Sequence, residues 1–129
     1  MGSYQITCGA DQIFRIYFDG YIEEADAQAY RDEIVEIFEQ ESEPIRSILY
    51  VANVRRVSGG ARRIFREVGQ RPMSGESVVL GTNRYLRVAA TFVIRAVGKN
   101  TIRVMDEEEE AVKWLQSFLA SSVDSVDRV

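Results

Sequence analysis

The residues with the clearest chemical potential lie in the segment SGGARRIF, which begins at Ser58. A serine just before a helix satisfies an otherwise unpaired backbone N–H, so Ser58 is predicted to be a helix cap. A phosphate on Ser58 would also meet the helix N-terminus and the guanidinium groups of Arg62 or Arg63. The unmodified segment has the same chemistry toward a phosphorylated ligand. Ser58, Gly59 and Gly60 are therefore a candidate phosphorylation or anion site, with a simple helix cap as the alternative.

Arginines surround this segment and form a candidate partner-binding surface. The residues of this surface are Arg55, Arg56, Arg62, Arg63 and Arg66. Arginine pairs in bidentate fashion with carboxylates and phosphates, which suits an acidic protein partner or another anion. In the helix predicted after Ser58, the arginines at 62, 63 and 66 are expected to face outward. The alternative is a solvated face, or a face that pairs with an acidic helix of the same chain.

The absence of histidine from the sequence limits the chemistry that the chain can perform. It removes Ser-His-Asp triads, Cys-His pairs and His-ligated zinc. The acid–base candidates that remain are Asp19, Glu23, Glu24 and Asp26. No histidine, lysine or nucleophile accompanies them, and Asp106 and Glu109 fit a helix capping box better than a metal site. We therefore expect no catalytic residues, no metal and no cofactor.

Charge is segregated along the chain, although the net charge is only −4. Residues 1–43 hold eleven acidic residues and two arginines, residues 44–105 hold twelve basic and two acidic residues, and residues 106–129 hold seven acidic and two basic residues. The simplest interpretation is that acidic and basic helices lie side by side and neutralise each other. A basic face for an anionic partner is the alternative. Because the chain as a whole is acidic, we do not expect it to bind nucleic acid.

Hydrophobic periodicity predicts an α/β domain in which strands and helices alternate. The predicted strands are 4–8, 12–20, 47–54, 77–81 and 101–105, and the predicted helices are 23–42, 58–70, 82–100 and 106–120. The first two strands form an antiparallel hairpin, and "VRRV" after the third strand is expected to be a loop. Strands that alternate with helices favour a sheet whose remaining strands are parallel. The fold class is therefore a single mixed sheet with about four helices.

The helix predicted over 82–100 has an unusually broad apolar face. It either packs on more than one side or lies at an interface, so a homodimer through this helix is one expectation. The alternative is a pocket between sheet and helices, lined by Phe14, Tyr85 and Phe92. Such a pocket would suit a carrier of a small apolar or anionic-headed molecule, such as a lipid.

Length and composition fit one domain of ordinary size, over residues 1–120, with a polar and frayed tail at 121–129. No apolar run approaches the roughly 18 residues of a membrane span, and no signal peptide is visible. Cys8 is the only cysteine, so an internal disulfide cannot form and a cytoplasmic location is expected.

Three segments resemble the anti-sigma-factor-antagonist (STAS) domain family, in particular its divergent bacterial single-domain branch. They are IYFDGYIEEADAQAY, ILYVANVRRVSGGARRIF and IRVMDEEEEAVKWL. The resemblance covers about residues 10–119, and its last segment is similar to the usual end of the family. It implies a small α/β domain without catalysis that regulates by binding partner proteins, often a kinase-type anti-sigma factor.

The resemblance also implies a role for Ser58. Some members of the family are phosphorylated on a serine or threonine at the start of the second helix, and Ser58 holds that place. Regulatory members carry an aspartate just before this residue and another at the end of the central strand. Here these places hold Val57 and Asn53.

Overall fold

The computed structural model describes residues 2–81 and 83–127, with side chains up to residue 118. The strands are β1 (Ser3–Cys8), β2 (Ile13–Ile22), β3 (Ile45–Val57), β4 (Ser74–Leu80) and β5 (Ile102–Met105). The helices are α1 (Glu24–Gln40), α2 (Gly59–Gln70), α3 (Arg84–Val97) and α4 (Glu108–Asp127). No helix within these residues has the length and hydropathy needed to cross a membrane.

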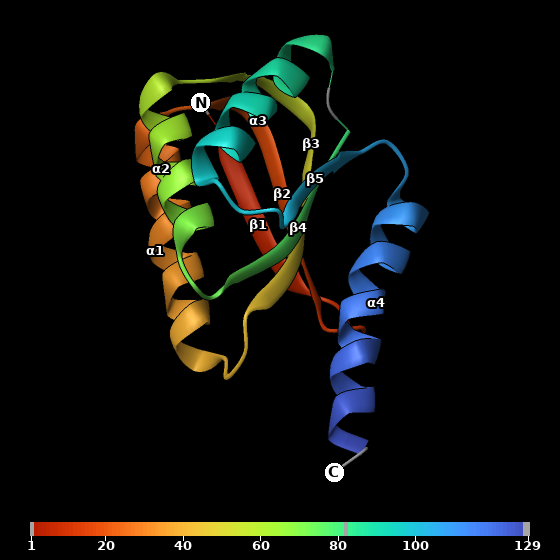
Figure 1. Ribbon diagram of the computed structural model, residues 1–129. Coiled ribbons are helices and arrows are strands. Elements are labelled where there is room, and N and C mark those ends of the chain that lie inside the picture. Colours follow the sequence, from red (N-terminus) through yellow and green to blue (C-terminus); the bar gives the residue numbers. More distant parts are fainter. Residues whose placement is uncertain (1, 82, 128–129) are drawn as a thin grey trace.

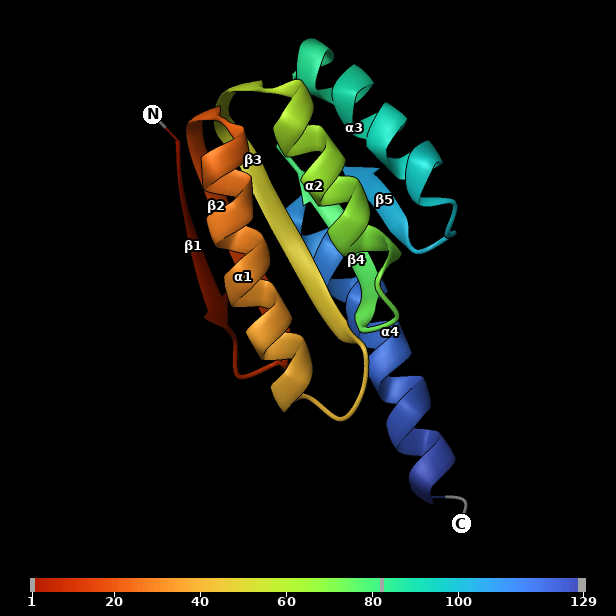
Figure 2. The ribbon, with the colours of Figure 1, turned by 90° about the vertical axis from the view of Figure 1, so that its left-hand side faces the viewer.

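The five strands form one sheet in the order β1-β2-β3-β4-β5 (Figure 1). β1 runs antiparallel to β2, and the other neighbouring strands are parallel. The predicted fold class, a mixed sheet that opens with an antiparallel hairpin, is confirmed. Because the strand order never reverses, right-handed crossovers place α1, α2 and α3 on the same face of the sheet. α4 lies alone on the opposite face (Figures 1 and 2).

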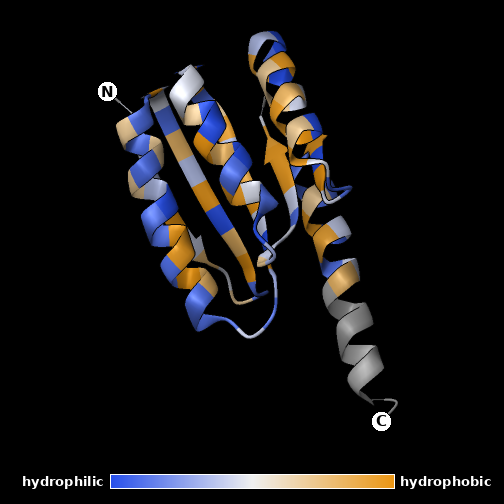
Figure 3. Cartoon of the chain, turned by 60° about the vertical axis from the view of Figure 1, so that its left-hand side comes forward, coloured by the Kyte–Doolittle hydropathy of each residue, from blue (hydrophilic) through white to orange (hydrophobic). Residues whose placement is uncertain are grey.

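Two hydrophobic cores hold the helices to the sheet. Between the sheet and α1 to α3, side chains such as Ile16, Phe18 and Ile34 are almost fully buried. Hydrophilic and hydrophobic residues alternate around these helices, as their amphipathic sequences predict (Figure 3). Under α4, Ala111 and Leu115 form the second core with the other face of the sheet.

The N-terminal end of α4 is fixed to the sheet by polar contacts. The hydroxyl of Tyr50 donates a hydrogen bond to the carboxylate of Glu108, and the ring of Tyr50 stacks on Tyr17 at 4.4 Å. Burial, followed by the neighbouring carboxylate of Glu108, raises the pKa of Tyr50 above its ordinary value. Arg15 approaches Glu108 through Nε at 3.8 Å and binds Asp11 through its two terminal nitrogens, Nη1 and Nη2. These ionisable groups therefore position α4.

β2 and β3 are longer than the sequence predicts, and the predicted loop "VRRV" is wrong. Asp19-Gly20 was expected to end the second strand, but Gly20 adopts φ 81° at a register shift and β2 continues to Ile22. β3 follows its parallel partner through Val57, which pairs with Ile22. The expected fraying of residues 121–129 stays a prediction, since α4 includes residues up to Asp127 and residues 128–129 lie outside the described part.

Candidate partner-binding surface

The parallel strands bring three helix N-termini to one edge of the sheet. β2, β3 and β4 all end at this edge, and α1, α2 and α3 begin there (Figure 2). The backbone N–H of Ser58 donates to the carbonyl oxygen of Ile22 at 2.9 Å, which ties the start of α2 to the end of β2. Without a reversal in strand order, the sheet has no crevice of the kind that holds nucleotides in doubly wound folds.

Ser58 is the N-cap of α2. Its backbone is extended (φ −68°, ψ 162°), and its hydroxyl oxygen accepts a hydrogen bond from the N–H of Ala61 at 3.1 Å. This confirms the predicted cap. Ser58 itself is half-buried, and the next residue, Gly59, is exposed.

A carboxylate also lies at this helix end, which the sequence did not indicate. A Cβ added to Gly60 would come within 3.0 Å of Oε2 of Glu24, from the first turn of α1. The small residue at position 60 therefore permits this close approach. The helix N-terminus attracts anions, but a phosphate on Ser58 would share the first turn of α2 with the carboxylate of Glu24.

Four of the predicted surface arginines are exposed, two at the end of β3 and two on α2. We call Arg55, Arg56, Arg63 and Arg66 the arginine face. None of the four forms an ion pair with any residue that the structure describes. The expected neutralisation by α1 is therefore not seen in this part of the chain. The ion pair between α1 and α2 that the structure shows joins Arg31 to Glu67 at 3.5 Å, with the arginine on the acidic helix.

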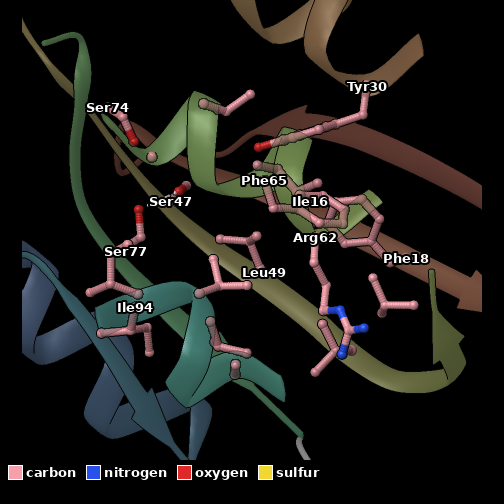
Figure 4. Close-up of a pocket in the computed structure, with 18 of the residues that line it drawn as sticks. Ile16, Phe18, Tyr30, Ser47, Leu49, Arg62, Phe65, Ser74, Ser77 and Ile94 are labelled. Atoms are coloured by element: carbon pink, nitrogen blue, oxygen red, sulfur yellow. Dashed lines mark hydrogen bonds between the residues drawn. The ribbon is translucent and has the colours of Figure 1, made fainter. Parts of the chain in front are cut away.

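Arg62 differs from the other predicted surface arginines. The sequence predicted that it faces outward, but its side chain is half-buried and lines a cavity between the sheet, α2 and α3 (Figure 4). Its Nη2 lies 3.9 Å from the position that a Cβ on Gly59 would occupy, so the guanidinium stays beside the first turn of α2. The helical repeat places Arg62 on the same stripe as Phe65 and Gly69, which also line the cavity.

The cavity has a volume of about 140 Å³ and an almost wholly apolar lining. A pocket between sheet and helices was expected, but Phe14, Tyr85 and Phe92 do not line it. Phe14 is buried in the neighbouring core, and the other two side chains lie exposed on the outer side of α3. A broad apolar face predicts that a helix is buried, but the sequence alone does not say which residues of that face contact the sheet.

Two of the acidic candidate residues form structural contacts: Asp26, which was considered for acid–base chemistry, and Asp106, which was considered as a cap or a metal ligand. Asp26 accepts from the backbone N–H of Glu23 at 2.9 Å in a capping box, and Asp106 pairs with Arg87 at 2.7 Å. The described residues contain no group of three acidic or cysteine side chains arranged to hold a metal ion.

No family model and no curated protein matches the chain, whereas several solved structures do. A protein of unknown role with a SpoIIAA-like fold from Shewanella loihica PV-4 aligns with TM-score 0.71 and 14% identity, over 89% of this chain and 95% of that chain. The anti-sigma factor antagonist SpoIIAA in its unphosphorylated form aligns with TM-score 0.62 and 14% identity, over 98% and 100%. An anti-sigma factor antagonist from Mycobacterium paratuberculosis aligns with TM-score 0.64 and 12% identity, over 90% and 95%. The chain therefore has a STAS-like, SpoIIAA-like fold, as the sequence resemblance implied.

Proposed function

We propose that this chain is a non-enzymatic regulatory module that binds a partner protein through the arginine face and the first turn of α2. The observation that carries the proposal is the set of exposed arginines, at the end of β3 and on α2, that form no ion pair within the described part of the chain. Like charges on one protein repel each other and lower the stability of the fold, and an anionic partner neutralises them on binding. Arginine in particular pairs well with carboxylates and phosphates. Two structural neighbours are anti-sigma factor antagonists, which supports a regulatory role. A kinase-type anti-sigma factor is the partner class that we infer.

Charge reversal tests the partner surface. In the test variant, Arg55, Arg56, Arg63 and Arg66 are changed to glutamate. In the control variant, Arg84 and Arg95 on α3 are changed to glutamate; both are exposed and lie outside the arginine face. Each protein is cross-linked in extract of the organism that encodes it, and the captured proteins are identified by mass spectrometry. A partner that the parent and the control capture and the test variant loses would support the proposal. If every captured protein also binds the test variant, the arginine face is not the binding surface.

Phosphorylation of Ser58 is a second, subordinate part of the proposal. A phosphate there would meet the N-terminus of α2 and the guanidinium of Arg62, although Glu24 lies beside the same turn. The measurement is the intact mass of the chain after incubation with extract and ATP. The gain of one phosphate in the parent, and none in Ser58→Asn, would identify the site. Asparagine is a better control than alanine because, like serine, it caps helices.

The exposed apolar stripe on α3 is where we expect a homodimer to form. Tyr85, Val88 and Phe92 lie at three- and four-residue spacing and are each about half exposed or more. Sedimentation of the parent and of Val88→Asp tests this expectation. A dimer that the substitution dissociates supports it, and a parent that is monomeric at 100 micromolar, roughly the upper range of weak but specific association, contradicts it.

We infer that the module acts in the cytoplasm.

A further inference from the structure

We propose that the cavity between the sheet, α2 and α3 binds an amphiphile that has a carboxylate head and an apolar chain of about eight carbon atoms. Arg62 holds the carboxylate, and the chain lies between the two helices and the sheet (Figure 4). This inference does not depend on the proposed partner surface. The arginine face is on the outside of the domain, whereas the cavity lies under α2 and α3.

The lining and volume of the cavity fit an apolar ligand. The floor comes from β2 to β5 and the roof from α1, α2 and α3, and the lining includes Leu49, Val79, Phe65, Ala90 and Val93. Its volume is about 140 Å³. An apolar cavity of roughly 150 Å³ in another protein stays dry and binds a six-carbon ring. Water molecules would therefore find few hydrogen-bond partners in this cavity. An apolar chain of similar carbon number would make van der Waals contacts with its walls.

α3 leaves this space because of where it is anchored. At its C-terminal end a Cβ on Gly69 would come within 2.8 Å of Val97, so the two helices approach closely there. Nε2 of Gln70 also donates to the carbonyl oxygen of Ala96 at 3.1 Å. The cavity-lining side chains of α3 include the small Ala89 and Ala90, which do not fill the distance to the sheet.

Ser47 and Ser77 at the far end of the cavity satisfy each other, whereas the hydroxyl of Tyr30, which also lines the cavity, has no hydrogen-bond partner among the described residues. The hydroxyls of Ser47 and Ser77 lie 3.1 Å apart, and Ser77 donates to the carbonyl oxygen of Gly75 at 3.3 Å. With Ser47 donating to Ser77, both hydroxyl protons have acceptors. A methyl end of the ligand can therefore lie against this pair without leaving a donor unpaired.

Arg62 supplies charge complementarity at the opposite end. It is the charged residue among those that line the cavity, and it forms no ion pair with the described part of the chain. A guanidinium group binds a carboxylate through two parallel N–H donors. The half-buried position of Arg62 lets solvent reach the head of the ligand while its chain lies against the apolar lining. An uncharged apolar ligand would leave the guanidinium of Arg62 without an anionic partner.

The spacing along α2 sets the length of the ligand. Arg62 and Gly69 both line the cavity, and a rise of 1.5 Å per residue separates their Cα atoms by roughly 10 Å along the helix. An extended chain of eight carbons spans roughly 9 Å, given C–C bonds of about 1.5 Å. A four-carbon chain would leave half of the cavity empty. Octanoate is therefore the probe that fits.

Calorimetric titration of the full chain with octanoate, butanoate and octan-1-ol tests the proposal. We expect octanoate to bind one site, butanoate to bind at least tenfold more weakly, and octanol to lose the contribution of the charge. Arg62→Gln should weaken octanoate about tenfold and leave octanol unchanged, and Ala90→Leu should block both by filling the cavity. Arg95→Gln, an exposed arginine of α3 outside the cavity, is the matched control and should bind octanoate like the parent.

Three results would overturn the proposal. The first is the absence of octanoate binding at concentrations below its aggregation. The second is octanoate binding that survives Ala90→Leu while circular dichroism shows that the variant is folded, since the ligand would then lie outside the cavity. The third is an equal loss of octanoate affinity in Arg62→Gln and Arg95→Gln, which would indicate a general effect of surface charge. None of these results bears on the test of the arginine face.

Discussion

The substitution Ser58→Ala isolates the structural role of the residue from any role as a switch. It removes the oxygen that accepts from the N–H of Ala61 at 3.1 Å. Loss of an N-cap hydroxyl costs about 0.5–2 kcal/mol of stability, depending on whether water can replace it. Ala61 is 0% exposed, so water does not reach its N–H and the loss belongs in the upper half of this range. We expect the free energy of unfolding to fall by about 1.5 kcal/mol.

The assay is urea unfolding followed by circular dichroism, for the parent, Ser58→Ala and Ser58→Asn. Asparagine ranks with serine as an N-cap, so Ser58→Asn should lie within about 0.5 kcal/mol of the parent. The slope of free energy against urea should be the same in all three, because the surface exposed on unfolding does not change. In a thermal scan, Ser58→Ala should melt about 5–6 °C below the parent.

The reasoning is refuted if Ser58→Ala matches the parent within about 0.3 kcal/mol at an unchanged slope, since the cap bond would then contribute nothing. It is also refuted if Ser58→Asn loses as much stability as Ser58→Ala, because the loss would then come from packing and not from the missing acceptor. The comparison matters for the phosphorylation test. A destabilised variant such as Ser58→Ala can fail to bind a partner because it is partly unfolded, and not because it lacks a phosphate.

Three further substitutions test the packing and charge of the domain. Gly69→Ala should lower stability by about 1 kcal/mol in urea unfolding, because the clash with Val97 at 2.8 Å outweighs the gain in helix propensity; a more stable variant would contradict this. Asp11→Asn should reduce the loss of stability in acid: the guanidinium of Arg15 lowers the pKa of Asp11, so its contribution is present above the ordinary value of 3.8 and is lost as pH falls through the lowered pKa. Equal acid unfolding of parent and variant would exclude that contribution. Ala90→Leu should raise the unfolding free energy by about 1 kcal/mol, as three buried carbons outweigh the lost rotamer freedom; a destabilised variant would mean that the cavity is too narrow for them.

Local pattern predicted the element order and the cap, because these depend on neighbours within one turn or one strand. The amphipathic spacing in α1 and the serine before α2 needed no knowledge of the rest of the fold. The ends of β2 and β3 were wrong for the opposite reason. Asp19-Gly20 has the composition of a turn, but pairing with β3 carries the strand through the positive φ of Gly20. A long-range partner decided the boundary.

Glu24 and Arg62 show the same limit within the site. The acidic start of α1 and the glycine at position 60 are 36 residues apart, and only the parallel pairing of β2 and β3 brings them together. Arg62 and Arg63 are adjacent in sequence but lie about 100° apart around α2. The spacing of Arg62, Phe65 and Gly69 at three and four residues was available as a signal for an inward stripe. An arginine on an apolar stripe is explained only when the space that it faces is known.

The position of Arg62 links the two proposals through one cation. Its guanidinium lies beside Gly59 at the first turn of α2 and also lines the cavity. A phosphate on Ser58 and a carboxylate in the cavity would both be attracted to this group, but they repel each other, and Glu24 adds a third negative charge. By linkage, each anion must weaken the other by the same factor. We therefore expect Ser58→Asp to bind octanoate about threefold more weakly than Ser58→Asn, with no difference for octan-1-ol. Equal octanoate affinities of the two variants would show that the cap and the cavity are electrostatically separate.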